Sequence, residues 1–217
     1  MKTVRLYKIL TFSIGLLLFS TCDRTVSGGG SSTGNANTIA GIILGPGGSS
    51  PAVCYIHAYP SDSIPTRADN GTIASVAADT SDSNGNYLLE NIPDGTYNLY
   101  CIDTSHYFST LLTDKTLSNN KTLFTGPDTL RIQITLSGKV QNSSGLQTIA
   151  FVYGSPIFTA IDDTSGLFQL TGLPFDLDVP VSFSGTAPVD GKRCTAEYFV
   201  TQLPDTSRFV VITLDCE

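Results

Sequence analysis

The sequence has few of the residues from which catalytic and metal sites are usually built. His57 and His106 are its only histidines, and neither lies in a cluster of His, Cys or Glu with the spacing of a zinc site. The serines near aspartates form no Gly-x-Ser-x-Gly turn, and nothing in the sequence positively favours a Ser/His/Asp triad. We therefore predict that the protein is not an enzyme and uses no cofactor or metal, and that each histidine is a surface or strand residue.

Basic residues are also scarce. The chain has 12 Lys and Arg against 19 Asp and Glu. Without Lys2, Arg5 and Lys8 near the N-terminus, the counts are 9 and 19, a net charge of −10. An acidic surface repels phosphate backbones and anionic lipid headgroups. Nucleic acid is therefore excluded as an expected partner, and the surface of the folded part is not expected to bind a membrane by charge.

Long apolar runs are absent as well. The run Ile9–Phe19 has eleven residues, three of them small or polar, whereas a transmembrane helix needs about 20. Because basic residues precede it, this run matches the apolar region of a secretory signal.

Cys22 follows this run directly, at the end of Leu-Leu-Phe-Ser-Thr-Cys. The arrangement resembles a bacterial lipoprotein signal, in which the cysteine becomes the lipidated first residue. Phe19 and Thr21 stand where such signals usually carry Leu and Gly or Ala, so an ordinary cleaved signal and an uncleaved anchor remain the alternatives. The resemblance implies a signal peptide over 1–21, a lipid such as palmitate on Cys22, and a location on an envelope membrane, facing the periplasm or the cell surface.

Glycine and serine dominate the segment behind Cys22. Residues 27–35 read Ser-Gly-Gly-Gly-Ser-Ser-Thr-Gly-Asn, a flexible composition whose reach is about 5–6 Å times the square root of its length. We expect 22–37 to form a tether that lets a folded domain stand away from the bilayer.

No segment beyond the tether has a helical period. Short alternating runs recur between clusters of Gly, Asn, Asp and Pro, which is the pattern of an all-β, antiparallel β-sandwich protein. The expected strands are Ile39–Leu44, Ala52–Tyr59, Tyr87–Glu90, Tyr97–Ile102, Leu130–Leu136, Ile149–Tyr153, Leu167–Thr171, Val179–Phe183, Cys194–Gln202 and Arg208–Leu214.

Two stretches repeat at an offset of 81 residues. Asp82–Pro93 and Asp163–Pro174 align without a gap. Each has an Asp, a tight turn on Gly, a strand with an aromatic residue, and a Pro. Asn84-Gly85 suits the positive φ of a hairpin turn. An internal repeat of this kind indicates two copies of one module.

The first copy resembles the carboxypeptidase regulatory-like domain, a β-sandwich of transthyretin-like or prealbumin-like type. The resemblance rests on Ala40–Ile43, Ala52–Ile56 and Asp82–Leu99 and covers 38–136. The second copy, 137–217, lacks the Pro-x-Gly-Thr-Tyr ending and is more divergent. The resemblance implies two tandem Ig-like or transthyretin-like sandwiches that serve as a non-catalytic structural spacer, scaffold or surface-binding module.

The cysteines divide evenly between the two copies. With Cys22 assigned to the lipid, Cys54 and Cys101 fall in the first copy, and Cys194 and Cys216 in the second. Because export favours oxidation, we predict one disulfide within each copy. Free buried thiols are the alternative.

The second pair comes with a geometric prediction. Cys194 and Cys216 flank Leu203–Ser207 symmetrically. A hairpin centred there would place the two cysteines opposite each other, within the range that a disulfide spans. The same hairpin would place Ala196 opposite Leu214.

Two features suggest a different function, a carbohydrate- or calcium-binding adhesion module with a glycan or envelope protein as partner. Asp79, Asp82 and Asn84, with Asp162 and Asp163 in the second copy, lie around turns and offer oxygen ligands, although they lack EF-hand spacing and turn chemistry accounts for them better. Several tyrosines are candidates for a sugar-binding face, although Tyr87 and Tyr97 alternate with polar residues as core residues do. The candidates are Tyr55, Tyr59, Tyr87, Tyr97, Tyr100 and Tyr107.

Overall fold

The computed structural model describes residues 37–67, 70–103, 108–175, 180–187, 191–200 and 207–216. Within these ranges the chain forms strands and no helix, so the predicted all-β class is confirmed. The strands are β1 Asn37–Leu44, β2 Tyr55–Pro60, β3 Ala77–Thr80, β4 Asn86–Ile92, β5 Gly95–Asp103, β6 Phe108–Leu117, β7 Thr122–Thr129, β8 Arg131–Gln141, β9 Gln147–Phe151, β10 Phe158–Ala160, β11 Leu167–Pro174, β12 Pro180–Thr186, β13 Arg193–Phe199, β14 Ser207–Thr213 and β15 Asp215–Cys216.

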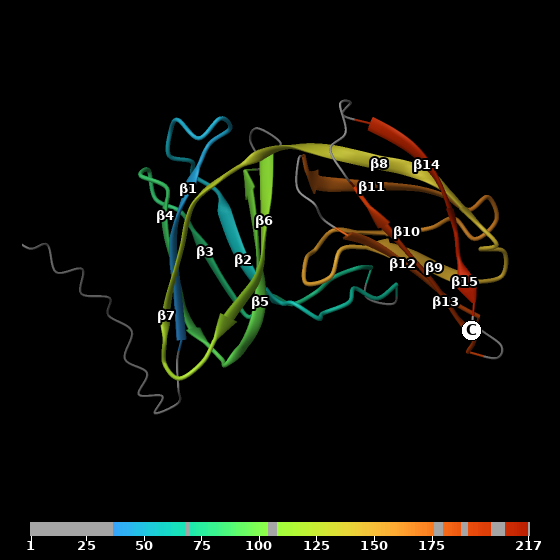
Figure 1. Ribbon diagram of the computed structural model, residues 1–217, viewed down its shortest axis with the longest axis horizontal. Coiled ribbons are helices and arrows are strands. Elements are labelled where there is room, and N and C mark those ends of the chain that lie inside the picture. The colour runs from blue at the N-terminus through green and yellow to red at the C-terminus, as the bar shows by residue number, and fades with distance from the viewer. Residues whose placement is uncertain are drawn as a thin grey trace, which may run out of the picture. The chain divides into compact units, whose positions relative to one another are not determined.

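The strands build two sandwiches of the same plan (Figure 1). They form three sheets, β4-β1-β7, β10-β9-β12-β13-β15, and a seven-stranded sheet β11-β8-β6-β5-β2-β3 in which β14 also pairs with β8. The first sandwich packs β4-β1-β7 against the β3-β2-β5-β6 part of the seven-stranded sheet, and the second packs its β11-β8-β14 part against the five-stranded sheet. Strand β1 lies between β4 and β7, and β8 lies between β11 and β14, so the first strand of each copy is central in the corresponding group. The duplicated strand order agrees with the duplication read from the sequence.

Most strand pairs are antiparallel, as predicted, and two are parallel. In β1 and β7, Ile39 lies opposite Leu123, and in β8 and β14, Gly138 lies opposite Val210. A parallel pair needs a long crossover connection. Here the connection from β1 to β7 runs through β2 to β6, and the connection from β8 to β14 runs through β9 to β13, so each includes strands of the opposite side of its sandwich.

Strand β8 takes part in the sheets of both copies. Its Arg131 and Ile132 lie opposite Ser109 and Phe108 of β6, and its later residues pair with β11 and β14. Ser137, the predicted first residue of the second copy, lies inside this strand. The division at 136/137 stays a prediction.

Each sandwich has its own apolar cluster. The first contains Ile39, Ile56, Leu89 and Leu99, drawn from both of its sheets. The second contains Leu136, Leu170, Val181, Phe183 and Ile212, and Tyr59, Tyr100 and Leu111 of the first copy also belong to it. Apolar contact therefore joins the two copies in addition to the shared strand.

The aromatic residue of the sequence repeat has a structural explanation. Tyr87 lies opposite Gly41 in β4–β1, and Phe168 lies opposite Gly138 in β11–β8. A Cβ atom on Gly41 would lie 2.7 Å from the Tyr87 ring, and one on Gly138 would lie 2.8 Å from the Phe168 ring. In both copies the ring therefore covers a central-strand glycine at a distance that no larger residue permits.

A fragment tests the division into copies. Residues 37–136 are expected to melt cooperatively, because the first apolar cluster is drawn from this segment. The fragment begins at Asn37, whose side chain donates to the Ile92 carbonyl and accepts from Lys121 N. Size-exclusion chromatography should show self-association, because Tyr59, Tyr100 and Leu111 lose their cover. The absence of a cooperative melt would mean that the copies fold only together.

Candidate functional site

The predicted lipid attachment residue, Cys22, lies outside the described residues, as does the signal over 1–21. Strand β1 begins at Asn37, one residue inside the predicted tether. No helix in the described part of the chain is long and apolar enough to cross a membrane. The lipid anchor therefore stays a prediction.

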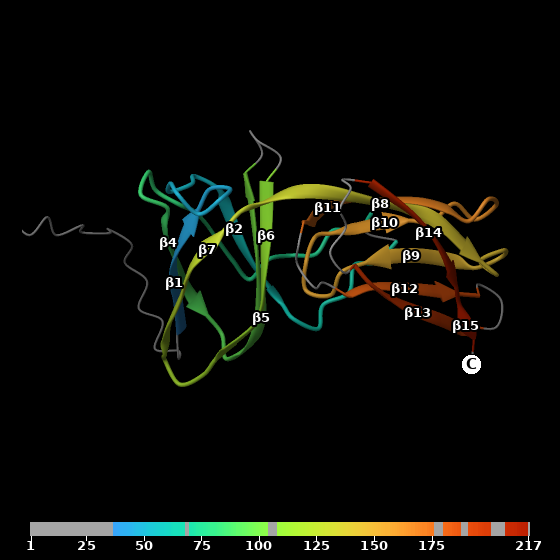
Figure 2. The same cartoon turned by 45° about the horizontal axis from the view of Figure 1, so that its top comes forward.

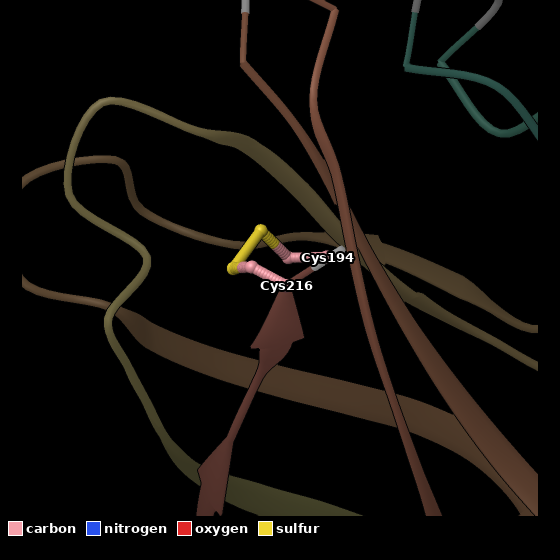
Figure 3. The surroundings of a disulfide bond; sticks show 2 residues. All are labelled: Cys194 and Cys216. Carbon is pink, nitrogen blue, oxygen red and sulfur yellow. A yellow bond between two sulfur atoms is a disulfide. The ribbon is translucent and has the colours of Figure 1, made fainter.

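The predicted disulfide of the second copy is present (Figure 3). Cys194 of β13 and Cys216 of β15 are bonded, with Cα atoms 4.0 Å apart. They lie directly opposite each other in an antiparallel pair. The bond therefore closes the two-residue strand β15 onto the edge of the five-stranded sheet.

The long hairpin from which this pairing was inferred is not formed; only its open end, next to the cysteines, is present. Strands β13 and β15 pair through only one further couple, Thr195 with Asp215. The preceding strand β14 pairs with β8 in the opposite sheet instead. The alternating pattern does not distinguish the two sheets. Val210, Ile212 and Leu214 are buried in the sandwich core as they stand, and they would also have been buried if the segment had paired with β13 in the predicted hairpin.

The two cysteines of the first copy are buried free thiols. Cys101 lies opposite Ile56 in β5–β2, and Cys54 stands two residues before Ile56. The thiols hydrogen-bond to each other; this contact lowers the pKa of Cys54, and the same contact together with burial raises the pKa of Cys101. The predicted disulfide is not formed in this structure, although its partners are neighbours.

Among the carboxylates considered as calcium ligands, Asp82 and Asp162 accept hydrogen bonds from amides of their own turns, and Asp79 accepts from Leu88 N of β4 at 2.7 Å. Asp82 Oδ1 accepts from Asn84 N and Asn86 N, each at 2.9 Å. In the second copy Asp162 takes this role, accepting from Ser165 N at 2.6 Å. Asp163, which the gapless alignment placed there, forms an ion pair with Arg67 at 2.6 Å. Within the described residues, no group of three or more His, Cys, Asp or Glu is placed to hold a metal ion.

The described tyrosines that were candidates for a sugar-binding face do not form one, and Tyr87 and Tyr97 are core residues, as their alternation indicated. Tyr59, Tyr87, Tyr97 and Tyr100 are buried, and burial raises the pKa of Tyr100 to about 12. Tyr55 is exposed, and Tyr107 and His106 lie outside the described residues. His57 is a strand residue of β2 whose ring stacks on that of Tyr59, with 6.1 Å between centroids.

A groove that the sequence did not indicate lies on the outer face of the five-stranded sheet, whose strands run side by side in Figure 2. We call it the sheet groove, and its volume is about 400 Å³. Strand pairing defines its floor, because Phe151, Ser182 and Glu197 form one row and Ser184, Thr195 and Asp215 form the next. The neighbouring residues Val181 and Phe183 point to the core.

One wall of the sheet groove comes from the first copy. Ile64 lines it, in the loop after β2, and Ser63 of the same loop accepts a hydrogen bond from Gly154 N at 3.0 Å. Tyr153 stands beside this contact, and its ring meets the edge of Phe151 with 4.9 Å between centroids. The Tyr153 carbonyl accepts from Asn98 Nδ2 at 3.0 Å. The aromatic wall is therefore fixed by hydrogen bonds on both sides.

The floor of the sheet groove holds a buried hydroxyl without a partner. Ser182 is 5% exposed, and its Oγ forms no hydrogen bond in the described part of the molecule. Most buried polar groups in native proteins are hydrogen-bonded, so each exception needs an explanation. Arg193, Glu197 and Asp215 line the same groove. The groove thus combines an aromatic wall with hydroxyls and charged groups on its sheet face.

The comparisons with known proteins show no family. No protein-family model matches the chain, and no curated protein sequence does. Among solved structures, the chain is similar to a type II cohesin–X-dockerin complex chain from Acetivibrio cellulolyticus, with 15% identity, a TM-score of 0.32, and coverage of 44% of this chain and 58% of that one.

Two pilin structures align over more of the chain. The minor pilin of Streptococcus agalactiae has 13% identity and a TM-score of 0.34, over 82% of this chain and 95% of that one. A shaft pilin variant from Lactobacillus rhamnosus GG has 9% identity and a TM-score of 0.30, over 83% and 98%. Similarities this weak do not bear on what the present chain does.

Proposed function

We propose that this chain is a non-catalytic lipoprotein of a bacterial envelope. Its two carboxypeptidase regulatory-like β-sandwiches act as a spacer, scaffold or surface-binding module. A lipid on Cys22 holds the protein to the membrane, and the Gly/Ser segment behind it lets the sandwiches stand away from the bilayer.

The observation that carries the proposal is the order of segments at the N-terminus. A basic stretch and an eleven-residue apolar run precede Cys22, and a Gly/Ser segment of flexible composition follows it. The first strand, β1, begins at Asn37. A chain that is to be held at a bilayer by one lipid needs this sequence of parts. The acidic surface supports the same conclusion, because it gives the folded part no attraction of its own to anionic lipid.

The alternative, a calcium-binding adhesion module, has less support. The oxygens of Asp82 and Asp162 are engaged by backbone N–H groups of their own turns. Calcium takes six to eight oxygen ligands, and these donors would have to be displaced.

The anchor is tested by Cys22→Ala. Wild-type protein is expected to partition into the detergent phase and to incorporate labelled palmitate. The variant is expected to remain as the unprocessed precursor or to appear in the soluble fraction, without label. Ser20→Ala is the matched control, because it alters the same signal and leaves the cysteine. Equal labelling of Cys22→Ala and wild type would refute the proposed anchor.

A further inference from the structure

Ser182 is the starting point. Its hydroxyl lies buried in the floor of the sheet groove without a hydrogen-bond partner. A buried hydroxyl left unpaired destabilises the folded state. In this structure Oγ itself has almost no accessible surface. A rotation about χ1 that turns Oγ toward the groove, where a ligand group hydrogen-bonds to it, would remove this cost and strengthen the binding of that ligand.

The neighbours of Ser182 indicate what kind of ligand this is. A hydroxyl both donates and accepts, a carboxylate accepts, and a guanidinium donates. The groove presents all three within three successive outward-facing rows. Ser182 and Glu197 lie in the first row, Ser184 lies in the second, and Arg193 lies in the third, opposite Thr186. A ligand that satisfies such a set carries several groups that donate and accept at once, as the hydroxyls of a sugar do.

The wall adds an apolar requirement. Tyr153 and Ile64 are partly exposed and line the groove beside its hydroxyl-bearing floor. A pyranose ring has C–H faces that pack on an aromatic ring and hydroxyls around its edge. The volume of about 400 Å³ lies within the range of about 300–1,000 Å³ that small-molecule sites occupy.

Charge narrows the class of sugar. The described lining of the groove carries the carboxylates of Glu197 and Asp215 and one guanidinium, that of Arg193. The whole chain has a net charge of −7. Phosphorylated and acidic sugars would be repelled.

We propose that the sheet groove binds a neutral sugar residue, with Ser182 and Glu197 hydrogen-bonding to its hydroxyls and Tyr153 packing on its ring. The site rests on the second copy and on the loop that carries Ile64, so it does not depend on the proposed lipid anchor. It gives the proposed surface-binding role a ligand class.

The test uses the full chain in detergent and two sets of probes. One set is free glucose, galactose, mannose and N-acetylglucosamine, measured by calorimetry. The other is an array of neutral glycans that end in the same sugars. The two sets distinguish a free monosaccharide ligand from the end of a longer glycan. Binding of at least one probe is expected, and Ser182→Ala and Glu197→Gln should each weaken it about tenfold.

Thr148→Val is the matched control. Thr148 is also buried on this sheet with an unpartnered hydroxyl, but it lies opposite Gly185, in the row that faces the core, and not in the groove. The control should bind the sugar as wild type does. Its thermal unfolding and that of Ser182→Ala should be no less cooperative than wild type, because both changes remove an unsatisfied polar group.

Three results would overturn the proposal. They are the absence of binding by every neutral probe, unchanged binding by both groove variants, and tighter binding of an acidic glycan or an unglycosylated peptide than of any neutral sugar. A protein that partitions into detergent and binds no sugar refutes the groove alone. A Cys22→Ala variant that still partitions into detergent refutes the anchor alone.

Discussion

Gly166→Ala is expected to lower the free energy of unfolding by about 3 kcal/mol, whereas Gly145→Ala should lower it by about 1 kcal/mol. Both glycines have positive φ, 71° and 78°, so both variants bear the cost of a left-handed backbone. They differ in surroundings. A Cβ atom on Gly166 would lie 2.4 Å from the Val140 carbonyl oxygen, and nothing lies within 4 Å of one on Gly145.

The Val140 oxygen cannot move away without loosening the turn. Val140 N donates to the Gly166 carbonyl at 2.8 Å, and Gly166 N donates to the Asp162 carbonyl at 2.8 Å. These bonds fix the turn between β10 and β11 against β8. Displacing the carbonyl therefore weakens the central strand of the second copy as well as the turn.

The first copy offers the same comparison, between Gly85→Ala and Gly47→Ala. A Cβ atom on Gly85 would lie 2.2 Å from the Ile43 carbonyl oxygen, while Gly47, also at positive φ, has open space around it. Urea unfolding midpoints at constant slope give the four differences. Equal losses at Gly166 and Gly145, or at Gly85 and Gly47, would mean that backbone conformation alone sets the cost.

Each of the ten strands predicted from alternation has a counterpart in the structure. Other strands were not predicted, and the two longest of these, β6 and β7, show why alternation did not reveal them. In β6 the alternation breaks at Asp114, which has a φ of 58°. The register of β5 against β6 shifts at this level, and Asn98 Oδ1 accepts from Asp114 N at 3.0 Å. A bulge hides a strand from a period-2 pattern. Strand β7 contains Gly126-Pro127, which reads as a loop and is tolerated because β7 is an edge strand.

The internal repeat predicted from the sequence is present, but the predicted alignment of its two turns is wrong by one residue at the aspartate. The gapless alignment matched Asp163 to Asp82. In the structure the second turn is one residue longer, since Gly166 N reaches back four residues to Asp162 while Gly85 N reaches back three to Asp82. Two neighbouring aspartates cannot be told apart by pattern, because either can accept amide bonds in a turn.

The sheet groove lay beyond prediction for a different reason. Ser182 and Ser184 read as the polar face of a strand, which is what most outward serines are. These serines line a groove only because β9, β12, β13 and β15 are neighbours in one sheet and because a loop of the first copy reaches the same face. These contacts join residues far apart in sequence, and no local period records them.

Cys216→Ala is expected to lower the free energy of unfolding by about 3 kcal/mol. The Cys194–Cys216 bond closes a loop with a sequence separation of 22, and the chain-entropy estimate gives about 3 kcal/mol for a loop of this length. For residues 37–216 melting as one unit, the melting temperature should fall by about 6–12 °C. Cys216 is exposed, so little packing is lost with it. Asp215→Ala is the matched control, because it alters the same two-residue strand and leaves the bond.

A reductant turns the same variant into a test of the first copy. Reduced wild type should melt as Cys216→Ala does. Reductant should leave Cys216→Ala unchanged, because Cys54 and Cys101 are free thiols. If it lowers the melting temperature of Cys216→Ala further, the first pair is oxidised in the isolated protein, as the sequence predicted.

Non-reducing peptide mapping identifies the linked cysteines directly. A peptide joining Cys194 to Cys54 or Cys101 would contradict the β13–β15 pairing and the assignment of one pair to each copy.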